Sequence, residues 1–133
     1  MFITISILSI HHLNILSFFF KVEKLDITAP MNEIRNAFSR LEETLKSPIS
    51  IYIFNAGVTH PFDILVGDDA CYEHHLKCIE VNLLGTIKCT NVAVGSLKRS
   101  NRAGHIVCIG SLAAKRGYPG GAGYCASKSG LQS

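Results

Sequence analysis

Tyr124 and Lys128 lie four residues apart, and of the side chains in this sequence they are the pair best suited to proton transfer. At this spacing two residues of a helix share one face and lie within reach of each other. A tyrosine with an ordinary pKa of about 10 is a poor base at neutral pH, and a nearby ammonium lowers that pKa by favouring the phenolate. The pair therefore predicts a site that exchanges a proton with an alcohol or a carbonyl group.

Two polar segments follow apolar runs that predict buried strands. Ser111 follows the run 105–109, and a tripeptide that ends in glycine follows the run 49–54. This tripeptide consists of Asn55, Ala56 and Gly57. In open α/β sheets ligands bind at the carboxyl ends of the strands, and a glycine there allows the backbone to approach a ligand closely. We therefore expect Asn55 and Ser111 at one edge of a sheet.

The elements that must position these residues alternate between strands and helices. Strands are predicted over 22–27, 49–54 and 105–109, and helices over 28–46, 69–100 and from Tyr124 onward. This order predicts an α/β protein with a parallel sheet and right-handed crossovers. Asn82 and Gly85 fall inside the long helix, where both residue types weaken helices, so a kink is expected there.

Residues 1–20 are apolar except for three polar residues near the centre, and they allow two interpretations. The length is just sufficient for a membrane anchor, but the central polar residues count against one. The other interpretation is a strand from Phe2 to Ile10, or an unstructured leader. The segment has no basic region and no small-residue cleavage site, so a cleaved signal peptide is not expected. We divide the chain into a leader, 1–21, and one domain, 22–133.

Charge excludes a nucleic-acid-binding protein. The net charge is +3, and no basic run is longer than Lys115-Arg116, so there is no basic stripe. Charged residues make up 17% of the chain, below the roughly 25% of soluble domains. This low share is typical of an α/β protein whose strands are buried on both faces.

The cysteines and histidines favour reduced thiols and no metal. Five cysteines without a C-x-x-C pair indicate buried, reduced thiols and a cytoplasmic protein. If residues 1–20 form an anchor, the domain faces the cytosol. Four residues of metal-ligand type fall at helical spacing, namely Cys71, His74, His75 and Cys78. A closed zinc site draws ligands from two elements, and no second set is evident, so we interpret them as a packed stripe.

Five motifs occur in the order and spacing typical of one family. They are Asp26-Ile27-Thr28, Asn55-Ala56-Gly57, Asn82 within VNLLGT, Ser111 within IGS, and Tyr124-x-x-x-Lys128. Over residues 22–133 the chain resembles the short-chain dehydrogenases/reductases, in their shorter rather than their extended branch. The resemblance implies part of a Rossmann-like, doubly wound parallel sheet in three α/β/α layers. It also implies an oxidoreductase that interconverts an alcohol and a carbonyl by hydride transfer with NAD or NADP.

The resemblance assigns a role to each catalytic candidate. Tyr124 would be the general acid/base, and Lys128 would lower its pKa and hold the nicotinamide ribose. Ser111 would orient the substrate oxygen, and Asn82 would hold a water in a proton relay.

For the remaining candidates the resemblance implies contacts with the cofactor. Asp26 with Ile27, and Asn55 with the following Ala56 and Gly57, would flank the adenosine half of the dinucleotide. Asp26 has an alternative role as a turn or helix-cap carboxylate. The expected partners are a small-molecule alcohol or carbonyl and, in the full-length form, further copies of the chain.

The sequence departs from the family pattern at the turn that seats the pyrophosphate. No T-G-x-x-x-G-x-G segment precedes Asp26, and the glycine-rich stretch 117–123 lies in the loop before Tyr124 instead. The first strands and the C-terminal substrate region of the family are also missing, so we expect a fragment. The alternative function is therefore a catalytically inactive relic that acts at most as an interaction subunit.

Overall fold

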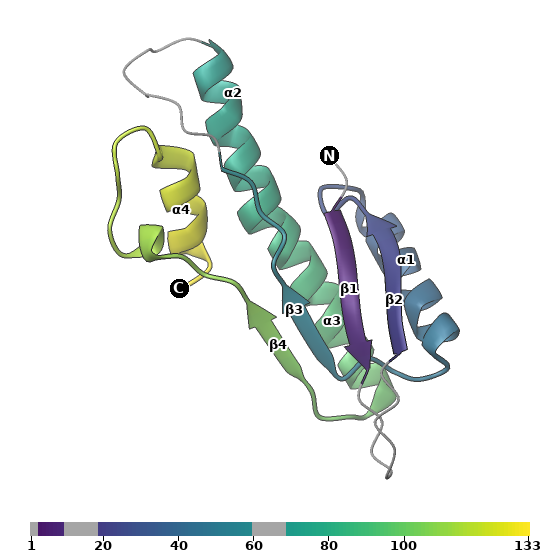
Figure 1. The fold of residues 1–133 in the computed structure, drawn as a ribbon. Helices are drawn as coiled ribbons and strands as arrows, with labels where there is room; N and C mark the ends of the chain where they lie inside the picture. The colour runs from purple at the N-terminus through teal and green to yellow at the C-terminus, as the bar shows by residue number, and fades with distance from the viewer. Residues whose placement is uncertain (1–2, 10–18, 60–68) are drawn as a thin grey trace. The chain divides into compact units, whose positions relative to one another are not determined.

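The computed structural model describes residues 3–9, 19–59 and 69–133 (Figure 1). The strands are β1 (Ile3–Ser9), β2 (Phe19–Leu25), β3 (Ile51–Phe54) and β4 (His105–Cys108). The helices are α1 (Met31–Leu45), α2 (Asp69–Cys78), α3 (Thr86–Ser100) and α4 (Ala122–Gly130), with a π-helical segment η2 (Ile79–Gly85) and a 3₁₀ turn η3 (Leu112–Ala114). The chain forms two compact units, the first of residues 1–54 and 88–107 and the second of residues 55–87 and 108–133.

Three of the four strands, β2, β3 and β4, run in the same direction, and β1 runs against them (Figure 1). β1 pairs antiparallel with β2, with Ile3 opposite Leu25 and Ser9 opposite Phe19, and β3 pairs with β4. β1 also contacts β3, so it lies between β2 and β3, and Figure 1 shows it running against the direction of the other strands. The strand at Ile3–Ser9 agrees with one of the two interpretations of residues 1–20.

Helix α1 begins and ends where the sequence indicates. Pro30 occupies the N-cap position, where its missing N–H costs no hydrogen bond. Lys46 adopts a left-handed conformation at φ 51°, and its N–H bonds back to the last turn. The apolar stripe of the helix is buried, and Phe38 stacks on Tyr52 of β3 at a ring-centroid distance of 5.7 Å. Packing of this stripe against the strands therefore holds α1 in place.

The predicted burial of β3 and β4 is wrong for one face of the sheet. Tyr52 and Phe54 are buried toward the helices, but Ile53 is 55% exposed and Val107 is 42% exposed. Figure 1 shows why: among the described parts of this unit, α1 and α3 lie on the same face of the strands. Strands are buried on both faces only where helices cover both.

The long helix predicted over 69–100 is confirmed, with an irregular centre. α2, η2 and α3 follow one another without a break, and η2 contains both residues that predicted a kink, Asn82 and Gly85. A π segment adds a residue to the turn and is often found at functional sites. No helix in the described ranges is long and apolar enough to cross a membrane.

The cysteines differ in accessibility. None of the five, all of which lie in the described part of the chain, forms a disulfide. Three are buried as predicted, but Cys108 is exposed and Cys125 is half-buried. Burial raises the pKa of the Cys89 thiol to about 12, against a smaller opposing effect of Lys88. The Cys89 thiol is therefore both inaccessible and protonated at neutral pH.

We predict that a thiol reagent at pH 8 modifies Cys108 in the folded chain and leaves Cys89 unmodified until the chain is denatured. The thiolate is the reactive form, and Cys89 cannot form it while buried. Mass spectrometry of the labelled peptides measures both rates, and Cys108→Ser should remove the fast reaction whereas Cys89→Ser should not. Since the folded pKa is raised from 9.0, the stability contributed by this thiol should be lost as the pH rises from about 9 through about 12.

Candidate active site

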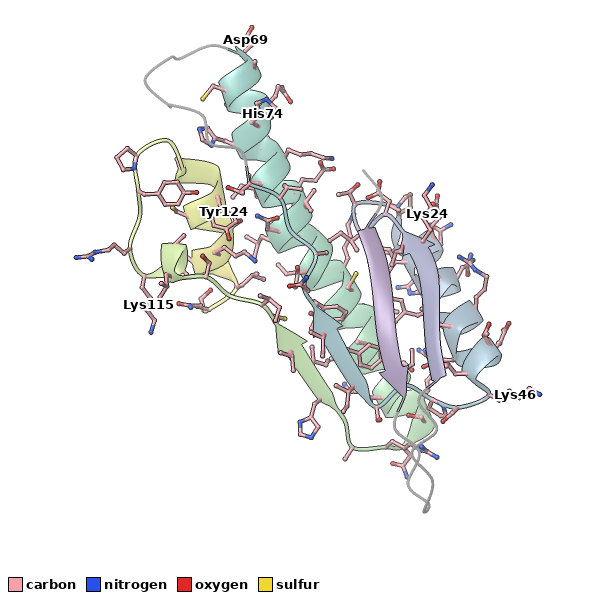
Figure 2. All side chains as sticks on the ribbon, viewed as in Figure 1. Lys24, Lys46, Asp69, His74, Lys115 and Tyr124 are labelled. Carbon is pink, nitrogen blue, oxygen red and sulfur yellow. The ribbon has the colours of Figure 1, made fainter. Side chains whose placement is uncertain are left out.

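Helix α4 of the second unit carries the predicted acid/base pair, and Figure 2 shows Tyr124 on it. Lys128 is only 5% exposed, and its Nζ donates a hydrogen bond to the backbone oxygen of Ile109 at 2.7 Å. The same Nζ lies 5.9 Å from the centroid of the Tyr124 ring. The prediction that Tyr124 and Lys128 lie near each other is confirmed.

Small residues allow α4 to pack closely against the long helix. Gly123, Ser127 and Gly130 recur along one side of α4, and Ser127 is completely buried. A Cβ at Gly123 would lie 2.5 Å from the backbone oxygen of His75, and one at Gly130 would lie 2.9 Å from a methyl carbon of Leu83. Real Cβ atoms are not found so close to backbone atoms, so Gly123 permits the observed packing, whereas at Gly130 the flexible Leu83 side chain could move aside.

Asn82 joins three parts of this unit through its buried side chain. Its Oδ1 accepts the N–H of Val58 at 2.7 Å, and its Nδ2 donates to the oxygen of Val58 at 2.9 Å and to Ser127 Oγ at 3.1 Å. Ser127 Oγ in turn donates to the backbone oxygen of Tyr124 at 2.7 Å. Both N–H groups of the amide are therefore used within the protein. The predicted role of Asn82 in holding a relay water stays a prediction.

The tripeptide after β3 reaches the same place. A Cβ at Gly57 would lie 3.2 Å from Asn82 Oδ1 and 3.7 Å from Lys128 Nζ, so the backbone at Gly57 runs beside both side chains. Asn55 is exposed and Ala56 is half-buried. The structure thus brings Gly57 next to the Lys128 ammonium.

Ser111 lies two residues beyond the carbonyl that Lys128 binds. Its Oγ accepts the N–H of Ala113 at 3.2 Å, which caps the η3 turn, and its side chain is half-buried. The hydroxyl proton remains available to a ligand, since this bond uses only an acceptor position. The expected convergence of Ser111 with Tyr124 on one substrate oxygen stays a prediction.

Asp26 and Ile27 belong to the first unit and form a turn there. Asp26 Oδ1 accepts the backbone N–H of Thr28 at 2.9 Å and its hydroxyl at 2.7 Å, which is the alternative role expected for this carboxylate. Lys88 of α3 donates to the backbone oxygens of Thr28 and Ala29 and so holds the turn. The Ile27 side chain is buried, which leaves its backbone for any contact with a ligand.

Sequence reasoning missed two residues that position α4. Ser127 lies inside the Tyr124-Lys128 motif, three residues after the tyrosine. This helical spacing was the one feature of the sequence that could have indicated its role. His75 was assigned to a packed stripe, but its Nδ1 accepts the N–H of Gly123 at 3.1 Å and its Nε2 lies 3.5 Å from Cys71 Sγ. Within the described residues no group of three or more metal-ligating side chains occurs.

Comparison with known proteins identifies the family. The family model described as short chain dehydrogenase matches residues 9–133, and the chain belongs to this family of oxidoreductases. The resemblance inferred from the motifs is confirmed.

Curated relatives are similar over part of their length. The chain is 36% identical over 80 residues to 17-beta-hydroxysteroid dehydrogenase 13 of Homo sapiens, covering 60% of the chain and 25% of that protein. It is 33% identical over 103 residues to the 3-oxoacyl-(acyl-carrier-protein) reductase FabG of Rickettsia conorii, covering 77% of the chain and 39% of that protein. The chain therefore spans between about a quarter and two fifths of these relatives.

Solved structures show the same fold. A short chain dehydrogenase from Mycobacterium smegmatis superposes with a TM-score of 0.71 at 20% identity, covering 80% of this chain and 42% of that one. A structure from Agrobacterium tumefaciens superposes with a TM-score of 0.69 at 27% identity, covering 81% of this chain and 40% of that one. The predicted partial Rossmann-like α/β fold is confirmed.

We predict that Asn82→Leu lowers the free energy of unfolding by about 2–4 kcal/mol, because the buried N–H and C=O of Val58 would lose their partner. Denaturant unfolding measures the loss. The matched control is Asn91→Leu on the exposed side of α3, which should change stability by less than about 0.5 kcal/mol. Equal effects of the two substitutions would contradict the structural role of the Asn82 amide.

Proposed function

We propose that the protein is an NAD- or NADP-dependent oxidoreductase that interconverts an alcohol and a carbonyl, with Tyr124 as the general acid/base. The observation that carries this proposal is the environment of Lys128. Its buried ammonium is held by the oxygen of Ile109 and lies beside both the Tyr124 ring and the backbone of Gly57. A buried ammonium is costly unless it has hydrogen-bond partners, so this arrangement is typical of a functional site.

The donor set around Lys128 fits the nicotinamide end of a dinucleotide. An ammonium has three N–H groups, and one of those of Lys128 binds the oxygen of Ile109. Two remain for ribose hydroxyls, and Gly57 carries no side chain that would fill the space beside them. When bound, the nicotinamide supplies or accepts the hydride.

In the proposed reaction, side chains of the protein transfer the proton to and from the substrate oxygen. In the direction of reduction the Tyr124 hydroxyl gives its proton to the substrate oxygen, and in oxidation it takes the proton back. Ser111 donates a hydrogen bond to the same oxygen. Its Oγ accepts the N–H of Ala113, and this bond does not use the hydroxyl proton. Asn82 keeps α4 in register through Ser127 and, in the proposed relay, holds a water near Tyr124.

The adenosine half of the cofactor is assigned to backbone and short polar side chains. Asp26 and Ile27 at the end of β2, and Asn55 with Ala56 after β3, follow two strands that run in the same direction (Figure 1). Carboxyl ends of such strands form the ligand edge of an open α/β sheet. The named relatives, a hydroxysteroid dehydrogenase and an oxoacyl reductase, support an alcohol or carbonyl substrate.

A homo-oligomer and a cytoplasmic location complete the proposal. Large apolar side chains are exposed along the part of the long helix in the second unit, including Tyr72, Leu76 and Leu84. Exposed apolar surfaces of this kind often mark protein–protein contacts, which supports association between copies of the chain. Five cysteines without a disulfide support a reducing compartment.

We predict that Tyr124→Phe lowers kcat of the intact protein by at least the 10²- to 10⁴-fold range of general acid/base catalysis, and leaves the fold intact. Steady-state kinetics with a panel of alcohols and carbonyls, each with NAD(H) and NADP(H), measures the change. Tyr118→Phe is the matched control, since Tyr118 is exposed in the loop before α4 and should keep its turnover. A kcat of Tyr124→Phe near that of the wild type would show that another group transfers the proton.

We also predict that the 133-residue chain binds NAD(H) and NADP(H) weakly or not at all. The sequence contains no T-G-x-x-x-G-x-G turn, which is the main anion site for the pyrophosphate in this family. Nucleotide fluorescence titrations decide the question. Micromolar affinity would contradict this expectation and show that other residues seat the phosphates, whereas weak binding agrees with the alternative role as an interaction subunit.

A further inference from the structure

His75 of α2 makes a hydrogen bond that the proposed reaction does not use. Its Nδ1 accepts the N–H of Gly123, the second residue of α4, at 3.1 Å. The first N–H groups of a helix have no partner within the helix, and a side chain at the N-cap position usually accepts one of them. The N-cap residue here is Gly121, which has no side chain and makes no such bond. His75 therefore supplies from another helix the cap that Gly121 lacks.

The same bond fixes the tautomer of the ring. An Nδ1 that accepts a hydrogen bond carries no proton, so in the neutral ring the proton is on Nε2. That nitrogen lies 3.5 Å from Cys71 Sγ, one turn earlier on α2, and sulfur is a weak acceptor. Both ring nitrogens of His75 thus have a partner, and the accepting nitrogen, Nδ1, faces α4.

The backbones meet at the same point. A Cβ at Gly123 would lie 2.5 Å from the backbone oxygen of His75 and 2.6 Å from its Cα. Figure 2 shows α2 and α4 side by side, in agreement with their close contacts. Gly123 immediately precedes Tyr124, so the first turn of α4 and the tyrosine are placed against His75.

We propose that His75 is a positioning residue, which caps the helix that carries Tyr124 and Lys128 and sets where that helix starts. Side-chain bonds hold α4 at its start through His75, in its middle through Asn82 and Ser127, and near its end through Lys128 with Ile109 and Ser129 with Ala114. Removal of the first bond frees the Tyr124 end and leaves the Lys128 end in place. The catalytic effect rests on the proposed function, whereas the capping does not.

The first test compares His75→Leu with His75→Asn by hydrogen exchange at the Gly123 amide. The Asn side chain places an oxygen near the position of Nδ1, and Leu has a similar size without an acceptor. Exchange of Gly123 should be about fivefold faster in His75→Leu, as expected for a lost helix cap, and near wild type in His75→Asn. His105→Leu, which replaces an exposed histidine of β4, should leave this rate unchanged.

The second test needs no substitution. Nitrogen-15 NMR of the wild-type chain at a pH where the ring is neutral identifies which nitrogen carries the proton. We expect the proton of His75 on Nε2. A proton on Nδ1, or equal Gly123 exchange rates in the wild type and His75→Leu, would overturn the cap even if the variants are too unstable for kinetics.

Kinetics separates positioning from structure. In the intact enzyme His75→Leu should lower kcat about tenfold with KM for the cofactor within twofold, because a small displacement of an acid/base group affects the reaction more than binding. His75→Asn should restore most of kcat. Faster Gly123 exchange with an unchanged kcat would overturn the positioning role. If the wild type turned over no alcohol or carbonyl, the proposed function would fail, and the exchange and tautomer measurements would still decide the cap.

Discussion

The buried amide of Asn82 is the interaction on which the second unit depends. Polar groups that are removed from water are costly unless they are paired, and this amide pairs with both backbone groups of Val58 and with Ser127. One side chain thus holds the segment after β3 and the helix α4 against the long helix. Any shift of α4 would leave several buried groups without partners, so the amide selects one packing among the many that small residues allow.

Close packing and charge burial follow from this constraint. Gly123 lets the backbone of α4 approach the long helix, and Lys128 on the same helix is only 5% exposed. The ammonium must then find its partners within the protein, and the carbonyl of Ile109 is one of them. The remaining N–H groups are directed by the same bond. The position of the Lys128 ammonium beside the Tyr124 ring therefore depends on helix packing as well as on the Tyr-x-x-x-Lys spacing.

The sequence predicted most elements and the proximity of Tyr124 to Lys128, but not the bonds between elements. Apolar periodicity located the helices and strands to within a few residues, and helical spacing placed Tyr124 beside Lys128. Periodicity shows which residues share a face but not what that face meets, so the exposed face of β3 and β4 was missed. The π segment also adds a residue per turn and changes which side chains of the long helix point at α4. For this reason the pairing of Asn82 could not be read from spacing, and that of His75, which precedes the π segment, joins α2 to a residue 48 positions further along the chain.

The hairpin of β1 and β2 has a consequence for the order of folding. These strands are close in sequence, so their pairing closes a short loop, whereas β3 pairs with β4 across the whole long helix. Contacts between distant residues form more slowly, because the entropy of a long loop is lost before they add stability. The bonds that fix α4 against the long helix join residues 45 and 48 positions apart. We therefore expect the hairpin to form early, and α4 to dock among the last events, after the surface that receives it is complete.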